Sequence, residues 1–396
     1  MMKRSRGLIL AMAAGLCLSG CWDQTELNDR AIVVGSGLDW RDRAPSIIVT
    51  EQIVLPQGVS AKSALSQNSI AVSASGTGVL NAMNKIQSYL SRKNFISHRR
   101  VFFVGEAMAK HGLLNVLDEM TRNPDVRLRS DAFVVRDATA QDVLRLRSPL
   151  EKIPSLGAVR SRHLLGAATG TSFLDFLIAA ADETDFATLP VVRVRQEGLI
   201  LGQREEDILQ FIGRAVFSKD LRLIDYLTVN EATYRLWVLG VLKSTTLTVP
   251  LPRNSGEMAV DVRRFRSKVM VNWTTGIPNF DIRLMAAGSV IENPTTLDLK
   301  RQTIVKKVEQ AMGVTIARRT WKMIHKVQTR DHADIFQFGH DVLRRYPGRW
   351  NTVKKDWPAI FSAANVTVHC DIALLTTGVT GRSPHLNPQQ FDQSGW

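Results

Sequence analysis

The stretch 97–144, SHRRVFFVGEAMAKHGLLNVLDEMTRNPDVRLRSDAFVVRDATAQDVL, decides the fold. Its apolar pattern predicts a strand at 101–104, a helix at 107–120, a strand at 128–135 and a helix at 139–146. Strands that alternate with helices in this way are typical of a mixed α/β domain. We therefore expect an α+β or mixed α/β protein of two or three domains, in which helices pack against mixed and antiparallel sheets.

The segments before this stretch predict a hairpin and a helix. The β-branched runs at 31–38 and 47–55 are separated by a polar turn, which predicts an antiparallel pair of strands. Residues 57–78 are rich in Ser, Gly and small side chains, and we interpret them as a mobile loop or a weak edge segment. Apolar residues at helical spacing predict a helix over 79–90. We expect the last helix of the opening stretch to begin at Asp137.

The segments after the opening stretch predict a second unit that starts near residue 211. Alternating apolar residues favour an antiparallel sheet there, and apolar residues three and four apart favour a long amphipathic helix, kinked at Gly313. The predicted elements are a hairpin at 213–224, a helix from Thr228, strands at 258–266, 269–273 and 280–286, helices at 294–327 and 336–345, and a strand at 366–374.

The polar sequence RQEGLILGQREED is interpreted as the boundary between two domains. We expect a signal peptide at 1–20, an N-terminal domain at 21–200 that forms one unit or two subdomains, a C-terminal domain at 205–381 and a flexible tail at 382–396.

The first twenty residues have the pattern of a secretory signal. Lys3, Arg4 and Arg6 precede an apolar run from Gly7 to Leu18. The run falls well short of the roughly 20 residues that a helix needs to cross a bilayer, so we expect it to be cleaved.

The end of the leader, Leu18-Ser19-Gly20-Cys21, resembles the lipobox of bacterial lipoproteins. Cys21 would then carry a diacylglyceryl group and an N-acyl chain and become the mature N-terminus, held on the membrane by its acyl chains. The alternative is an ordinary signal peptide followed by an unmodified cysteine. Because Cys17 leaves with the signal and Cys21 takes the lipid, Cys370 has no partner for a disulfide in the mature chain. Its alternating apolar neighbours predict a buried strand face.

The sequence carries no recognisable catalytic or metal-binding motif. G-x-x-x-x-G-K-[ST], G-x-S-x-G, H-E-x-x-H, S-x-x-K and C-x-x-C are all missing. His325, His332 and His340 are too far apart in sequence for a compact ligand set. We expect no catalytic residue, no metal and no cofactor apart from the lipid on Cys21.

The chain is strongly basic, with a formal net charge of +14. Export argues against nucleic acid as the partner. One basic cluster joins Arg92-Lys93 to His98-Arg99-Arg100, and another comprises Arg263, Arg264, Arg266 and Lys268. These clusters face anionic lipid headgroups or acidic partners, or they form an ordinary solvated surface, and the sequence leaves these alternatives open.

An ordered series of short segments resembles the Ger(x)C spore germination lipoproteins, the C subunits of nutrient germinant receptors in endospore-forming bacteria. The segments are Cys21-Trp22-Asp23, Glu26-Leu27-Asn28-Asp29, Gly35-Ser36-Gly37-Leu38-Asp39, Ser97-His98, Val104-Gly105-Glu106, Arg122-Asn123-Pro124-Asp125-Val126-Arg127, Gly213 to Phe217, Asp334-Ile335-Phe336 with Gly339, and Trp350 with Trp357.

This resemblance implies a lipid-anchored, non-enzymatic protein on the outer face of the cytoplasmic membrane, which in the spore is the inner membrane. It implies two polytopic membrane subunits as partners in nutrient-triggered germination, and it leaves nutrient binding by this subunit open. The residues expected at an interface are Trp22, Asp23, Glu26, His98, Arg122, Arg127 and Asp334. The alternative function is a substrate-binding lipoprotein of an import system, which would show two similar lobes around a ligand cleft.

Overall fold

The structure is a computed structural model that describes residues 29–55, 68–146, 151, 153–164, 172–201, 204–251, 256–274 and 276–377. The predicted signal peptide, the lipobox with Cys21, the residues Trp22, Asp23 and Glu26, and the predicted tail at 382–396 lie outside the described residues. The rest forms a mixed α/β protein with two sheets, which confirms the predicted fold class.

The described residues up to Thr228 build a nine-stranded sheet and the helices around it. The elements are β1 (Arg30–Trp40), β2 (Ile47–Val54), β3 (Ser69–Gly76), α2 (Val79–Tyr89), β4 (Lys93–Phe95), the 3-10 helix η3 (Ile96–His98), β5 (Val101–Gly105), α3 (Glu106–His111), α4 (Leu114–Arg122), β6 (Asp131–Arg136), α5 (Ala140–Arg145), α6 (Pro154–Leu164), α7 (Phe173–Ala181), β7 (Thr188–Leu201), β8 (Arg204–Phe217) and β9 (Leu223–Thr228).

The large sheet has the order β3-β2-β1-β5-β6-β7-β8-β9, and β4 pairs with the start of β1. Its centre, from β1 through β5 and β6 to β7, is parallel, and both flanks are antiparallel. Parallel strands are normally covered on both faces. Here α2, α3, α4 and α7 cover one face, while α5 and α6 cover the other. Strand β5 shows why its sequence is a continuous apolar run, since Phe102 and Val104 enter one core and Val101 and Phe103 the other.

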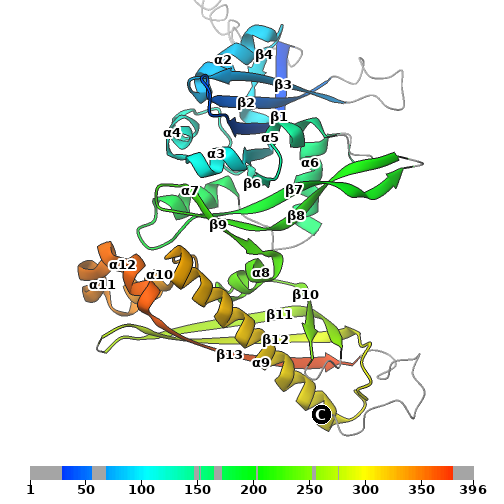
Figure 1. The fold of residues 1–396 in the computed structure, drawn as a ribbon, viewed down its shortest axis with the longest axis vertical. Helices are drawn as coiled ribbons and strands as arrows, with labels where there is room; N and C mark the ends of the chain where they lie inside the picture. The colour runs from blue at the N-terminus through cyan, green and yellow to red at the C-terminus, as the bar shows by residue number, and fades with distance from the viewer. Residues whose placement is uncertain are drawn as a thin grey trace, which may run out of the picture.

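The described residues from Val229 onward build a four-stranded sheet in the order β10-β11-β12-β13. Figure 1 shows this sheet below the large one, with α8 between them. The elements are α8 (Val229–Val238), β10 (Thr245–Pro250), β11 (Glu257–Asn272), β12 (Asn279–Glu292), α9 (Gln302–Lys326), the π-helical turn η6 (Val327–Asp331), α10 (Phe338–Arg345), α11 (Pro347–Val353), the 3-10 helix η7 (Lys354–Asp356), α12 (Trp357–Ala363) and β13 (Asn365–Thr376).

Strand β13 pairs with β12 in parallel, whereas the other two pairs of this sheet are antiparallel. A parallel neighbour needs a long crossover, and here α9, α10, α11 and α12 provide it. The purely antiparallel sheet expected for this region is therefore wrong in its last pair, although the predicted mixture of sheet types is correct.

Helix α9 packs along β13. An added Cβ at Gly313 would lie 2.3 Å from the carbonyl oxygen of Cys370, so the glycine lets the helix backbone approach the strand. Gly313 is inside a continuous helical segment, and close contact rather than the predicted kink explains its position. Cys370 faces the apolar core under this helix, as its alternating neighbours predicted.

Three local predictions differ from the structure. The strands expected at 258–266 and 269–273 are one strand, β11, because Ser267 and Lys268 between them pair with β12 without interruption. The helix predicted at 107–120 is divided into α3 and α4 at Gly112, which has a φ of 119°. Helix α5 is capped by the side chain of Thr139, which binds the Asp142 N–H, and does not begin at Asp137.

The predicted domain boundary near residue 205 falls inside the large sheet. Both β8 and β9 pair with this sheet, which therefore continues to Thr228. The division into domains at 21–200 and 205–381 stays a prediction.

Candidate functional site at the junction of the two sheets

The two sheets share a hydrophobic core. The large sheet contributes Val216 of β8, Leu227 of β9 and Phe186, which lies just before β7. These side chains belong to the same buried cluster as Trp237 of α8 and Phe280 of β12. We call the contact between segment 182–186 and residues 332–341 the junction. Because apolar residues of both sheets form one core, we expect the two sheets to move as one rigid body.

The loop at the junction has an uncommon backbone. It follows the π-helical turn η6, an irregularity that is frequent at functional sites. His332 and Gln337 both lie in the left-handed region, with φ values of 52° and 63°. Such values are uncommon for residues other than glycine, so surrounding contacts must hold the loop in place.

Asp334 supplies most of these contacts and has no exposed surface. One carboxylate oxygen accepts hydrogen bonds from the backbone N–H groups of Phe336 at 3.1 Å and Phe338 at 3.2 Å. The other accepts from the Gly339 N–H at 2.7 Å and the Trp357 indole N–H at 3.0 Å. These four donors fix the start of α10 against α12.

The pKa of the Asp334 carboxyl group is raised. Burial raises its pKa to about 6, helped by the neighbouring Asp185 carboxylate and opposed by the Gly339 and Trp357 hydrogen bonds. The charge of the loop therefore depends on pH in a range close to neutrality.

Segment 182–186 binds this loop from the side of the large sheet. The Phe186 N–H donates to the carbonyl of Asp334 at 3.2 Å, and the Gln337 amide donates to the Asp185 carboxylate at 3.1 Å. The loop that Asp334 organises is thus joined directly to the strand β7 that follows Phe186.

Two ion pairs flank this backbone contact. The His340 Nε2 lies 3.1 Å from Asp182, and the Lys354 ammonium lies 3.0 Å from Glu183. Burial raises the pKa of Asp182, but hydrogen bonds from Thr184 and the nearby His340 outweigh this effect and hold the pKa below its ordinary value. Asp182 is therefore charged and attracts His340 whenever the imidazole is protonated.

Two arginines are buried beside the junction. Arg235 of α8 donates from Nε to the carbonyl of Ile335 at 2.9 Å, and Arg214 of β8 donates to the hydroxyl and carbonyl of Thr188. Burial lowers the pKa of both guanidinium groups, and for Arg235 the carboxylates of Asp185 and Asp334 oppose this shift. The two carboxylates therefore favour the charged form of the buried Arg235 guanidinium, which is bonded to the loop through the Ile335 carbonyl.

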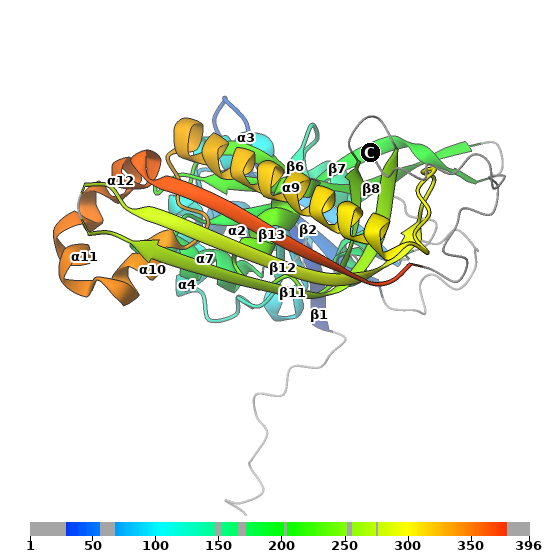
Figure 2. The same cartoon turned by 90° about the horizontal axis from the view of Figure 1, so that it is seen from below.

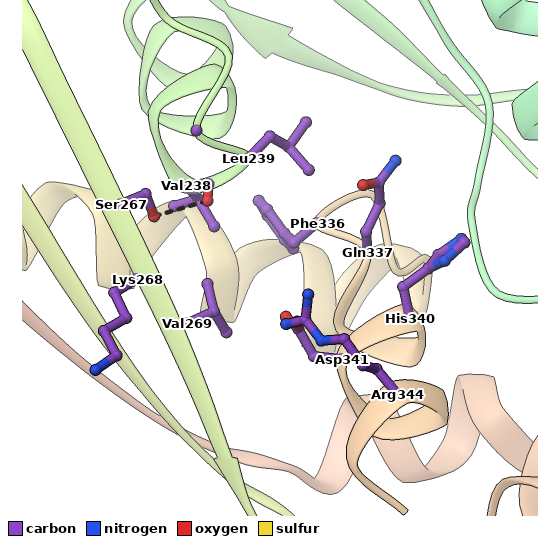
Figure 3. Close-up of a pocket in the computed structure, with 11 residues that line it drawn as sticks. Val238, Leu239, Ser267, Lys268, Val269, Phe336, Gln337, His340, Asp341 and Arg344 are labelled. Carbon is purple, nitrogen blue, oxygen red and sulfur yellow. Dashed lines mark hydrogen bonds and ion pairs between the residues drawn. The ribbon is translucent and has the colours of Figure 1, made fainter. Parts of the chain in front are cut away.

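A pocket of about 500 Å³ opens on the other side of the same loop. Its wall is made by the end of α8, by β11 and by the start of α10, with Val269 and Phe336 among its apolar residues (Figure 3). The Asp341 carboxylate in its wall is paired with the Arg344 guanidinium at 2.6 Å. Gln337 and His340 line the pocket and also bind segment 182–186, so the pocket and the junction share side chains.

Two protein-family models together match most of the chain. "Spore germination protein N-terminal domain" matches residues 23–194, and "Spore germination B3/ GerAC like, C-terminal" matches residues 212–378. The chain belongs to the Ger(x)C family of spore germination proteins.

Relatives of this Ger(x)C protein match over most of their length. The putative spore germination protein YfkR of Bacillus subtilis is 28% identical over 91% of this chain and 93% of its own. The spore germination protein KC of the same organism is 22% identical over 90% of this chain and 91% of its own. A solved structure, the crystal structure of the GerBC protein, has a TM-score of 0.58 at 15% identity and covers 89% of this chain and 100% of its own, so it shares the fold.

The Ger(x)C assignment makes this protein a homologue of the C subunits of spore germination receptors, which are not enzymes. Within the described part of the chain, no helix combines the length and apolar character that crossing a membrane requires. No group of three or more His, Cys, Asp or Glu residues among the described residues is arranged to hold a metal ion.

The predicted interface residues of this Ger(x)C chain are spread over the molecule. His98, Arg122 and Arg127 are exposed around the large sheet, and Arg122 pairs with Asp118 at 2.8 Å. Asp334 belongs to the junction and is fully buried, so it does not present a surface to a partner. Trp357 stood in the series of segments that carries the family resemblance, but its contact with Asp334 was not predicted. Segment 182–186 was not identified from the sequence at all, because these contacts depend on the fold.

Proposed function

We propose that this protein is the lipid-anchored C subunit of a nutrient germinant receptor, held on the outer face of the cytoplasmic membrane that becomes the spore's inner membrane. The lipid would be a diacylglyceryl group, with an N-acyl chain, on Cys21. It would act with two polytopic membrane subunits and carry out no reaction itself. The observation that supports the proposal is the position of Cys21: the lipobox-like segment ends at Cys21, two residues before the family match begins at residue 23.

The architecture suits a subunit that holds and positions its partners. The two sheets are joined by their shared core and by the loop that the hydrogen bonds of Asp334 hold in place. The pairs His340–Asp182 and Lys354–Glu183 add to this connection. The alternative, a substrate-binding lipoprotein of an import system, would show two similar lobes, whereas these sheets have nine and four strands in unrelated orders.

The first experiment replaces the two N-terminal cysteines separately in the full chain. Cys21→Ala should remove the lipid, which is measured as a mass change of the N-terminal peptide, and should shift the protein from the membrane fraction to the soluble fraction. Cys17→Ala is the matched control, since this residue lies inside the predicted signal peptide, and it should leave both unchanged. A Cys21→Ala protein that stays fully in the membrane fraction would disprove the proposed anchor.

The second experiment identifies the neighbours. Crosslinking a tagged copy in spore membranes, followed by mass spectrometry, should recover two polytopic membrane proteins. Recovery of a permease together with an ATPase would contradict the receptor proposal and favour import. The same spores carrying Cys21→Ala should germinate more slowly in response to nutrients.

A further inference from the structure

The four-stranded sheet has one covered and one open face. Its inner face carries Phe280, Ile282 and Leu284, which pack in the core with α8 and α9. In Figure 2 the strands β11, β12 and β13 lie side by side, and the helices lie beside or behind them. The outward residues of these strands are therefore available to a partner.

Basic side chains lie in register across this open face. Lys268 of β11 is directly opposite Arg283 of β12, and Arg283 is directly opposite His369 of β13. All three side chains are exposed. Arg264 and Arg266 continue the stripe along β11 at alternate positions. We call these five residues the basic face.

This register creates electrostatic repulsion between basic side chains in the isolated protein. Directly opposite residues in neighbouring strands lie about 5 Å apart, and like charges at that spacing repel one another. The row Lys268–Arg283–His369 places two permanent cations and an imidazole in this arrangement. An anionic partner would remove the repulsion and gain the attraction of several cations at once.

The acidic residues on the same face compensate only part of this charge. Asp281 lies 3.5 Å from Arg283 and 3.9 Å from His369. Asp371 is exposed on β13, opposite Met285. Two carboxylates thus face the four permanent cations of the basic face. Lys268 also lines the pocket next to Ser267 and Val269 (Figure 3).

The position of the face indicates what kind of partner fits it. The first described strand begins at Arg30, which pairs with β4, and β4 lies at the opposite end of the long axis from β11–β13 (Figure 1). A chain held to the membrane through Cys21 would approach it with the β4 end. The open face then points away from the lipid, as the view in Figure 2 along this axis shows.

We propose that the basic face is a docking surface for an acidic protein segment, whose Asp or Glu side chains lie across the row Lys268–Arg283–His369. This inference deepens the proposed function, since its orientation argument rests on the anchor at Cys21. The binding itself is a property of the folded chain and is tested without the anchor.

The test measures binding of a labelled peptide of alternating Glu and Ser to the purified full chain in detergent. The double variant Lys268→Gln/Arg283→Gln removes two cations from the row. The matched control is Lys306→Gln/Arg318→Gln, which removes two exposed cations from α9, away from the open face. We expect the row variant to bind about tenfold more weakly, the control to bind like the native chain, and native binding to weaken as salt is added.

Three results would overturn the inference. Equal weakening in both double variants would show that only the net charge matters, and unchanged binding in the row variant would show that the row does not bind. Vesicles containing phosphatidylglycerol provide the third: if the row variant loses vesicle binding but keeps peptide binding, the face docks on membranes. The melting temperature of the row variant should not fall, because the variant removes repulsion, and this measurement separates lost binding from lost folding.

Failure of this inference is distinguishable from failure of the proposed function. A chain that loses its lipid with Cys21→Ala should still bind the acidic peptide through the basic face. Conversely, the row variant should remain lipidated and in the membrane fraction. A photo-crosslinker at exposed Thr367, on the same face, should then react with an acidic segment of a receptor subunit in spore membranes.

Discussion

Gly339 of α10 and Thr184 touch across the junction, and a Cβ added at Gly339 would lie 2.8 Å from the Thr184 Cβ. The same Cβ would lie 3.0 Å from the Trp357 indole nitrogen. We predict that Gly339→Ala destabilises the protein by about 1–3 kcal/mol, because α10 must move away from segment 182–186. The free energy of unfolding in denaturant measures this.

The control for this substitution is Gly348→Ala. Gly348 is also in a short helix, α11, but no atom lies within 4 Å of an added Cβ. Since alanine favours a helix, this variant should be unchanged or more stable by up to about 1 kcal/mol. If both glycine variants behave alike, the contact between Gly339 and Thr184 has no energetic importance.

Asp334→Asn tests the charge at the centre of the junction. The pKa of Asp334 is raised to about 6 in the folded protein, so its protonated form favours folding below about pH 4, and this contribution is lost as the pH rises through 6. Relative to Asp334→Asn, the native protein should lose as much as about 3 kcal/mol of stability between pH 4 and pH 7. Urea unfolding of both proteins over this range checks the prediction, and a constant difference would contradict it.

Gly313→Ala should separate α9 from β13. The new methyl group would collide with the Cys370 carbonyl oxygen, a backbone atom that cannot turn aside. We expect a loss of about 2–4 kcal/mol in the free energy of unfolding. Val314→Ala is the control, because Val314 is 62% exposed on the same helix and its truncation should change stability by less than about 1 kcal/mol. Equal losses would argue against the close contact.

The thiol of Cys370 should be unreactive in the folded protein. Burial, with a smaller contribution from Asp371, raises its pKa to about 12, so very little thiolate exists at neutral pH. Alkylation by iodoacetamide, followed by peptide mass spectrometry, should be at least about tenfold slower than in the urea-unfolded chain. A cysteine placed at exposed Thr367 on the same strand is the control and should react quickly.

Local patterns predicted the elements whose sequence carries its own signal. The hairpin β1–β2, helix α2 and strands β5 and β6 lie close to where β-branched runs and helical spacing placed them. Ser172 caps α7 in a reciprocal pair with Asp175, three residues further along the chain. Such signals act over a few residues, so the sequence is sufficient to find them.

Features that depend on residues far apart in sequence were not predictable in this way. The contacts of Asp334 reach from Phe186 to Trp357, and nothing local marks these residues as neighbours. The basic clusters were visible in the sequence, but the row Lys268–Arg283–His369 exists only through the register of three strands. The sequence therefore indicated which charges are present, and the fold determined which of them act together.

The late position of β13 makes the C-terminal third of this protein sensitive to the order of synthesis. Strand β12 ends at Glu292, and its parallel neighbour begins only at Asn365. Until that strand emerges, the part of α9 that packs on β13, with the contact point at Gly313, stays uncovered. A premature stop codon anywhere before residue 365 would therefore remove more than an edge strand. It would leave an incompletely folded chain with exposed apolar surface, of the type that quality-control proteases remove.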